Sequence, residues 1–502
     1  MHIILTLIAL AFPTVEGYLS LRILEGKNPV LWNIERVCAG FLLGCSLSGF
    51  IIFFAVLLGV PLTFVGFLWI HIVIIAFLLV IFIKLKKKKK IGKKIECDLL
   101  VQAKNLKKIP LWLKIIIFWL VIWTALKVFA GGYDILHAPS YWDDNYANWN
   151  MRAQVMYTEQ NLMLHLNPNN PLYFGGRAAG YPMTAYITRI WIAMVNGEWS
   201  DEVVNNVSFL WFISFLTIFF CSLYRTFRRD KKSKHALVWT IFGVYVLVSL
   251  PLYLVHGTNP YIDVFMSGCL FMVLYWLLEW MQSKGNDSNS WLNILGFAAA
   301  MMAYVKNEAI LIFLPPLLLL FVAASWRKIP TLIGRVQSMF RAVFPALLVV
   351  IPWSIFKITH GLGFANNKSV GGVLDFVPDP YVPSAIFHDL MYTGSFSILF
   401  PLFLLIIFMS WNIWKKSYIG MLVIFLLIVF VGEFCIYWFT DLATEALQHT
   451  GFGRGMIHIV PLIVFVGLWL IREIIGDKES VSQHASTRTS PFDAAPTAPC
   501  SG

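Results

Sequence analysis

The sequence predicts an all-α polytopic membrane protein. Of its 502 residues, 58% are hydrophobic and only 13% are charged, a balance that soluble globular domains do not show. Apolar runs long enough to cross about 30 Å of hydrocarbon as helices recur from residue 2 to residue 472. The sequence lacks the alternating ten-residue pattern that is typical of a membrane β-barrel.

The apolar runs, taken in order, predict about thirteen transmembrane helices. The first run, near residues 2–24, has no basic segment before it and no clear small-residue cleavage site after it, so we expect a retained helix and not a signal peptide. The other helices are expected near residues 37–58, 64–83, 111–130, 204–224, 236–255, 261–281, 291–305, 308–325, 342–358, 395–413, 418–439 and 456–472.

Basic residues predict the orientation of these helices. They gather in short segments that each follow an apolar run: "KLKKKKKIGKK" (84–94), "RTFRRDKKSK" (225–234), "WRK" (326–328) and "WKK" (414–416). Such segments are typical of cytoplasmic loops, and they explain the net charge of +12 better than nucleic-acid binding does. The exoplasmic segments are then 131–203, which we expect to form juxtamembrane helices, and 256–261, 306–308, 359–394 and 440–455.

This topology predicts three parts of the chain. Residues 1–110 form three transmembrane helices and a polybasic cytoplasmic loop, and residues 111–476 form a transmembrane catalytic module with the exoplasmic loop 131–203. Residues 477–502 are rich in Ser, Thr, Ala and Pro, so we expect a disordered cytoplasmic tail. The seven cysteines are scattered singly, which predicts neither a disulfide framework nor a structural zinc site.

Every unusual polar motif falls on the predicted exoplasmic side, where polar residues near a membrane often mark a functional site. In "SYWDDNYANWNMRAQVMY" (140–157), the adjacent Asp143 and Asp144 could provide a general base, a metal ligand or a helix cap, and the spacing alone does not separate these roles. Trp149 and Arg152 follow at a helical spacing that could hold this segment against the bundle.

Asp144, Trp149 and Arg152, followed by "GYPMTAY" (180–186), resemble the first exoplasmic loop of bacterial glycosyltransferases of the GT-C superfamily. That superfamily includes the lipid-linked aminoarabinose transferases and the protein O-mannosyltransferases. Three later segments resemble it in the same order: "NPYIDVFMSG" (259–268), "MAYVKNEAILIF" (302–313) and "HTGFGRGMIHIVPL" (449–462). The resemblance covers residues 111–472, and the first three helices match no motif of the superfamily.

The resemblance implies an inverting glycosyltransferase in the plasma (inner) membrane with its active site on the exoplasmic face. Its donor would be a polyprenyl-phosphate sugar that enters from the lipid bilayer, and its acceptor would be an exoplasmic glycan, lipid or cell-wall polymer. Such a transfer needs a carboxylate to accept the acceptor's proton, for which we expect Asp144 and, second, Asp143. For the leaving phosphate we expect Arg454 and Lys306, and then Arg152.

Five further residues are predicted to contact substrate: Asp263, Glu308, Tyr181, His458 and Trp149. Each also has a structural alternative; for example, Asp263 could cap a helix and Glu308 could form an ion pair with Lys306. No cofactor or metal is predicted, although the paired aspartates with Asp263 or Glu308 leave a divalent cation open. The sequence has no P-loop, no GxGxxG that opens a helix after a strand and no GxSxG, so nucleotide chemistry is not indicated.

Three other functions fit parts of the pattern. A transporter or flippase of lipid-linked glycans would place its polar groups near the membrane midplane, often within internal repeats. An O-antigen polymerase or ligase would use similar donors and a large late exoplasmic loop, for which residues 359–394 are long enough. In a non-catalytic scaffold, Asp144 and Arg454 would be replaceable.

Overall fold

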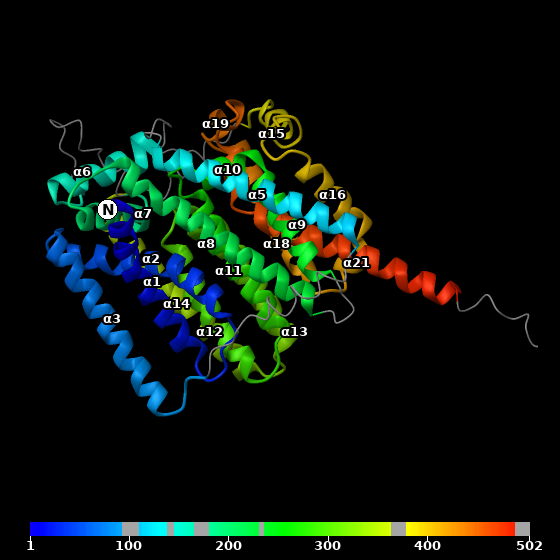
Figure 1. The fold of residues 1–502 in the computed structure, drawn as a ribbon, viewed down its shortest axis with the longest axis horizontal. Helices are drawn as coiled ribbons and strands as arrows, with labels where there is room; N and C mark the ends of the chain where they lie inside the picture. The colour runs from blue at the N-terminus through cyan, green and yellow to red at the C-terminus, as the bar shows by residue number, and fades with distance from the viewer. Residues whose placement is uncertain (93–109, 138–144, 165–179, 230–234, 363–377, 487–502) are drawn as a thin grey trace, which may run out of the picture.

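A computed structural model describes residues 1–92, 110–137, 145–164, 180–229, 235–362 and 378–486 (Figure 1). Within these ranges the chain forms helices and no strands. By length and composition, nine of these helices could cross a membrane, or up to ten if one bent pair counts as a single span. The prediction of an all-α polytopic membrane fold is confirmed.

The helices are numbered in chain order. Their bounds are α1 (His2–Glu25), α2 (Asn33–Leu57), α3 (Phe64–Lys87), α5 (Leu111–His137), the π-helical η2 (Asn145–Asn150), α6 (Met151–Glu159), α7 (Thr184–Asn196), α8 (Asp201–Arg228), α9 (Ala236–Ser249), α10 (Pro251–Gly257), α11 (Asp263–Gln282), α12 (Asn286–Ala303), the π-helical η3 (Ala309–Phe313), α13 (Leu314–Lys328), α14 (Leu332–Thr359), α15 (Val382–Met391), α16 (Leu399–Met409), α17 (Trp411–Trp414), α18 (Ile419–Phe439), α19 (Ala443–Leu447), α20 (Phe452–Ile457) and α21 (Val460–Ser486).

The prediction and the structure differ in the extent of several helices, including the following three. The helix expected near 236–255 is broken into α9 and α10, which meet at 83°, because Pro251 has no N–H to continue the helix and instead starts the next one. Helix α14 begins at Leu332, where the Thr331 side chain accepts a hydrogen bond from the Gly334 N–H. Helix α21 continues to Ser486, past the boundary expected near residue 477.

The first two helices touch through their backbones. Gly40 and Gly44 lie one turn apart on α2, and both face α1 at Gly17 and Pro13. A Cβ atom on Gly44 would lie 1.8 Å from the carbonyl oxygen of Pro13, so only glycine allows this approach. Beside this contact, Glu16 of α1 pairs with His71 of α3, with Oε1 and Nδ1 2.7 Å apart.

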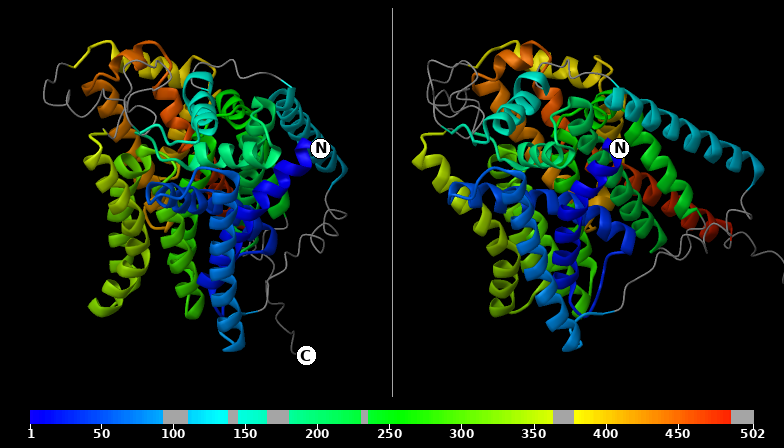
Figure 2. Two further views of the ribbon diagram at one scale, coloured as in Figure 1. Left: turned by 90° about the vertical axis from the view of Figure 1, so that its left-hand side faces the viewer. Right: turned by 60° about the vertical axis from the view of Figure 1, so that its left-hand side comes forward.

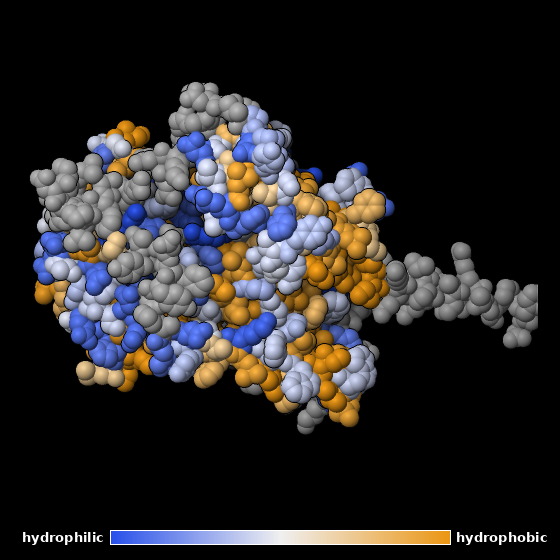
Figure 3. Space-filling view, turned by 90° about the horizontal axis from the view of Figure 1, so that it is seen from above, coloured by the Kyte–Doolittle hydropathy of each residue, from blue (hydrophilic) through white to orange (hydrophobic). Residues whose placement is uncertain are grey.

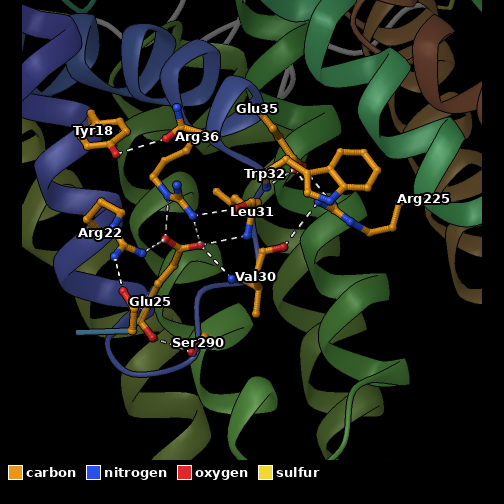
Figure 4. A network of polar contacts seen from close by, with 12 residues as sticks. Tyr18, Arg22, Glu25, Val30, Leu31, Trp32, Glu35, Arg36, Arg225 and Ser290 are labelled. Atoms are coloured by element: carbon orange, nitrogen blue, oxygen red, sulfur yellow. Dashed lines mark hydrogen bonds and ion pairs between the residues drawn. The ribbon is translucent and has the colours of Figure 1, made fainter. Parts of the chain in front are cut away.

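A buried polar network joins the other ends of α1 and α2 to the rest of the bundle (Figure 4). Arg36 donates to both carboxylate oxygens of Glu25, at 2.7 and 3.1 Å. Glu35 pairs with Arg225 of α8, and Ser290 of α12 donates to the Glu25 carbonyl at 2.6 Å. Because each buried charge in this set has an opposite partner, the network fixes the position of the N-terminal helices against α8 and α12.

The two ends of the bundle differ in character. Figure 2 shows α6, α15 and α19 at one end and the C-terminal end of α3 at the other; the last turn of α3 carries Lys84, Lys86 and Lys87. Helix α11 lies in the middle, and its membrane-length segment is completely buried. Its first residue is Asp263, which is where the site begins.

Candidate functional site

Asp263 is the centre of a cluster of four basic side chains. Its carboxylate is fully buried and lies within hydrogen-bond or ion-pair distance of four groups that come from three other segments of the chain. These are His256 Nδ1 at 3.0 Å, Lys306 Nζ at 2.8 Å, an Arg454 terminal nitrogen at 3.3 Å and His458 Nε2 at 3.3 Å. We call these five residues the Asp263 cluster.

The chain around Pro251 brings His256 to Asp263. The break at this proline turns α10 away from α9, and the short segment "TNPYI" then leads directly into α11. Arg189 of α7 donates to the Pro260 carbonyl at 2.7 Å and fixes this segment from the outside. His256 therefore ends one helix and Asp263 starts the next, and the two side chains face each other.

Lys306 lies in the turn between α12 and η3, between two carboxylates. Its Nζ is 2.8 Å from Asp263 Oδ1 and 2.8 Å from Glu308 Oε1. Burial alone would lower the pKa of Lys306, but the two carboxylates outweigh it and hold that pKa above its usual value. Burial would raise the pKa of Glu308, but Lys306, His458 and the hydrogen bonds of the carboxylate together outweigh this effect and hold that pKa below its usual value. Both residues are therefore charged at neutral pH.

A second contact joins this turn to the start of α7. Asn307 Nδ2 donates to the Gly180 carbonyl at 2.8 Å, and Lys357 of α14 donates to the same oxygen at 2.7 Å. The next residue, Tyr181, makes an edge contact with Trp149, whose ring also stacks on Tyr186. The structure thus brings Trp149 and Tyr181 together, but Trp149 is only 1% exposed, so its ring serves packing first.

Arg454 is the most exposed cation of the Asp263 cluster. Its side chain is 32% exposed, whereas that of Lys306 is 6% exposed. The guanidinium lies 5.2 Å from the centre of the Tyr261 ring, which in turn stacks on His256. The next residue, Gly455, lies against the buried Glu433 of α18. Arg454 thus contacts the Asp263 carboxylate and the Tyr261 ring, and part of its side chain is exposed.

The remaining predicted residues lie elsewhere in the structure or outside the described residues. Arg152 is buried on α6, which packs against α7. Asp143 and Asp144, expected to supply the base, lie outside the described residues, immediately before η2. Viewed from the end of the bundle that carries α6, α15 and α19, hydrophilic side chains gather around a hollow in the surface (Figure 3).

Four residues of this region were not predicted from the sequence: His256, Asn307, Lys357 and Glu433. Glu433 and Lys357 are isolated charges in long apolar runs, a signal that marks functional sites in membrane proteins and could have identified both. His256 and Asn307 lie in or beside short polar turns, and nothing in the sequence distinguishes them from ordinary loop residues.

Residues 178–356 match the family model described as dolichyl-phosphate-mannose-protein mannosyltransferase. The match includes Tyr181, Asp263, Lys306 and Glu308 and ends before Arg454. This is a GT-C superfamily family of membrane glycosyltransferases that use polyprenyl-phosphate sugar donors, so the predicted resemblance is confirmed and a glycosyltransferase is indicated. Neither the curated proteins nor the solved structures contain a match to this chain.

Proposed function

We propose that this protein transfers a sugar from a polyprenyl-phosphate donor to an exoplasmic glycan, lipid or cell-wall polymer. The observation that carries the proposal is the Asp263 cluster, in which two cations, Lys306 and Arg454, share one buried carboxylate. A guanidinium has five N–H donors, so Arg454 can contact Asp263 and a phosphate at the same time. Lys306, charged and fixed between two acids, adds positive charge without having to move during the reaction.

In the proposed reaction, Asp144 accepts the proton of the acceptor hydroxyl. The hydroxyl oxygen forms a bond to the anomeric carbon while the bond from that carbon to the phosphate oxygen breaks, with inversion. The polyprenyl phosphate leaves with the bonding electrons, and Arg454 and Lys306 stabilise its new negative charge. Asp263 holds both cations in place, and no metal enters these steps.

The experiment that tests this proposal is sugar transfer from polyprenyl-phosphate donors in membranes that contain wild type, Asp144→Asn or Asp143→Asn. Loss of the base should reduce transfer by about 100-fold or more in Asp144→Asn at equal protein levels. Asp143→Asn tests the second candidate for the base, and a loss of transfer in this variant alone would assign the base to Asp143. Equal transfer by wild type and Asp144→Asn would remove Asp144 from catalysis, whereas no transfer by wild type from any donor would favour a transporter, flippase or ligase.

We further propose that the Asp263 cluster faces the exoplasmic side of the plasma membrane. The lysines at the end of α3 support this, since basic residues mark cytoplasmic ends and these lie at the opposite end from α6, α15 and α19 (Figure 2). In intact cells, a membrane-impermeant maleimide should label His360→Cys but not Lys88→Cys, relative to wild type. Labelling of Lys88→Cys but not of His360→Cys would show the opposite topology.

A further inference from the structure

A second polar cluster lies between α15 and α20. His388 and Asp389 are near the end of α15, and His449 lies between α19 and α20. One possible ligand atom from each residue lies within 4.8 Å of the other two. The closest pair is His449 Nδ1 and Asp389 Oδ1 at 2.6 Å, and the two imidazole rings are 5.2 Å apart. None of the three belongs to the Asp263 cluster.

Asp389 has an oxygen that protein groups leave unsatisfied. Its side chain is only 6% exposed, and within the described part of the chain its buried Oδ2 has no hydrogen-bond partner. A buried carboxylate oxygen without a partner is costly, and such atoms call for a specific explanation. The His449 side chain is 43% exposed, and His388 is also exposed, so an ion could reach the carboxylate from water.

We propose that His388, Asp389 and His449 bind a divalent cation of the zinc class. Two imidazole nitrogens and one carboxylate oxygen form a ligand set that suits Zn²⁺ and leaves a fourth position for water. Mg²⁺ and Ca²⁺ prefer sites made of oxygen ligands only. The cation would also satisfy the buried Oδ2 of Asp389.

The three side chains need to adjust their positions to hold such an ion. Zn²⁺ lies about 2.0 to 2.2 Å from its nitrogen and oxygen ligands, so two ligand atoms of one tetrahedral site are about 3.3 to 3.6 Å apart. The three candidate atoms already lie within 4.8 Å. Rotation of the exposed imidazoles would close the difference, with the Asp389–His449 hydrogen bond replaced by bonds to the ion.

A cation bound at this site would affect the structure near Arg454. His449 shortly precedes Arg454, and α15 packs against both α19 and α20. A cation bound to all three residues would link α15 to the segment that carries Arg454. This inference does not depend on the proposed reaction, because it concerns only ion binding and the stability of that link.

The test uses the full chain, purified without a polyhistidine tag, treated with EDTA and dialysed. ZnCl₂ is then added while bound zinc is measured by elemental analysis and the thermal midpoint by intrinsic fluorescence. Wild type should bind one zinc per chain, and its midpoint should rise with zinc concentration, because a ligand that binds only the folded state stabilises it. MgCl₂ should give no such rise.

Three variants and one control make the result specific. Asp389→Asn and His449→Gln should weaken zinc binding at least about tenfold. His388→Gln should also weaken zinc binding at least about tenfold. It is the safer variant, because His388 is exposed and takes no part in the Asp389–His449 hydrogen bond, so loss of its imidazole should not affect folding. His360→Gln, a change at an exposed histidine elsewhere, should bind zinc as wild type does. Equal zinc binding by wild type and His388→Gln, or none by wild type, would overturn the proposal.

Discussion

The Nζ atom of Lys306 lies 2.8 Å from Oδ1 of Asp263, although the two residues are 43 positions apart in the chain. This buried ion pair joins the start of α11 to the turn after α12. Three of the motifs that the sequence singles out lie within the matched region, residues 178–356. Lys306 from one of them, and Arg454 and His458 from the later motif at residues 449–462, meet at this one carboxylate.

Removal of the Asp263 charge should destabilise the protein. Asp263→Asn leaves Lys306 and Arg454 without their shared carboxylate, and loss of one partner from a buried ion pair costs about 3–5 kcal/mol. We expect a clear drop in the thermal midpoint of the purified protein. The exposed Asp287→Asn is the matched control and should leave the midpoint nearly unchanged. A similar midpoint for the two variants would show that the cluster contributes little to stability.

Replacement of Arg454 should affect turnover more than folding. Its side chain is partly exposed, so Arg454→Gln should fold, but kcat for sugar transfer should fall about 100-fold because a donor to the leaving phosphate is lost. Arg454→Lys should recover only part of this loss, since an ammonium cannot make the same two-pronged contact. The exposed Arg327→Gln is the control. Unchanged kcat in Arg454→Gln would exclude Arg454 from the reaction.

Glu308 gives a prediction for pH. Its pKa lies below the usual 4.5 in the folded state, because Lys306, His458 and the hydrogen bonds of the carboxylate together outweigh the effect of burial. A carboxyl group whose pKa is lower in the folded than in the unfolded state stabilises the folded protein at pH values above the unfolded pKa. This stabilisation is lost as the pH falls toward the pKa of the folded state. The difference in thermal midpoint between wild type and Glu308→Gln should therefore be constant near neutral pH and shrink below about pH 4.5. A difference that grows on acidification would contradict the ion pair with Lys306.

The network around Glu25 should be structural. Glu25→Gln weakens the pair with Arg36 and leaves that guanidinium buried, at a cost of about 3–5 kcal/mol. The thermal midpoint should fall, while transfer per folded molecule should stay close to that of wild type. The exposed Glu198→Gln serves as the control. Loss of activity at full stability would show instead that the N-terminal helices take part in the reaction.

Two glycines test the contact between α1 and α2. In Gly44→Ala the new methyl group would overlap the Pro13 carbonyl, and we expect a loss of about 1–3 kcal/mol from overpacking. Gly432→Ala lies within α18, where nothing is within 4 Å of the new atom, so stability should stay the same or rise by about 0.4–1 kcal/mol. Thermal unfolding of the two variants side by side measures the difference. Equal midpoints would mean that α1 and α2 can separate without cost.

The sequence was sufficient for the fold class and for much of the site. Apolar run lengths predict the helices, and Asp263, Lys306, Arg454 and His458 come from motifs far apart in the chain that the structure brings together. The break at Pro251 could also have been predicted from proline chemistry. The contact between His256 and Asp263 could not be predicted from the sequence. It forms because α10 turns back toward α11, and this turn depends on tertiary packing with α7.

The burial of α11 also limits how this protein can change. A helix that is covered on every side cannot shift or accept larger side chains without repacking its neighbours, so Asp263 at its tip is a fixed point. Under the proposed function, a change in the accepted substrate would then come from other segments, such as α6, α15 and α19 at one end of the bundle (Figure 2). Attempts to redirect specificity should therefore diversify these three helices and leave α11 intact.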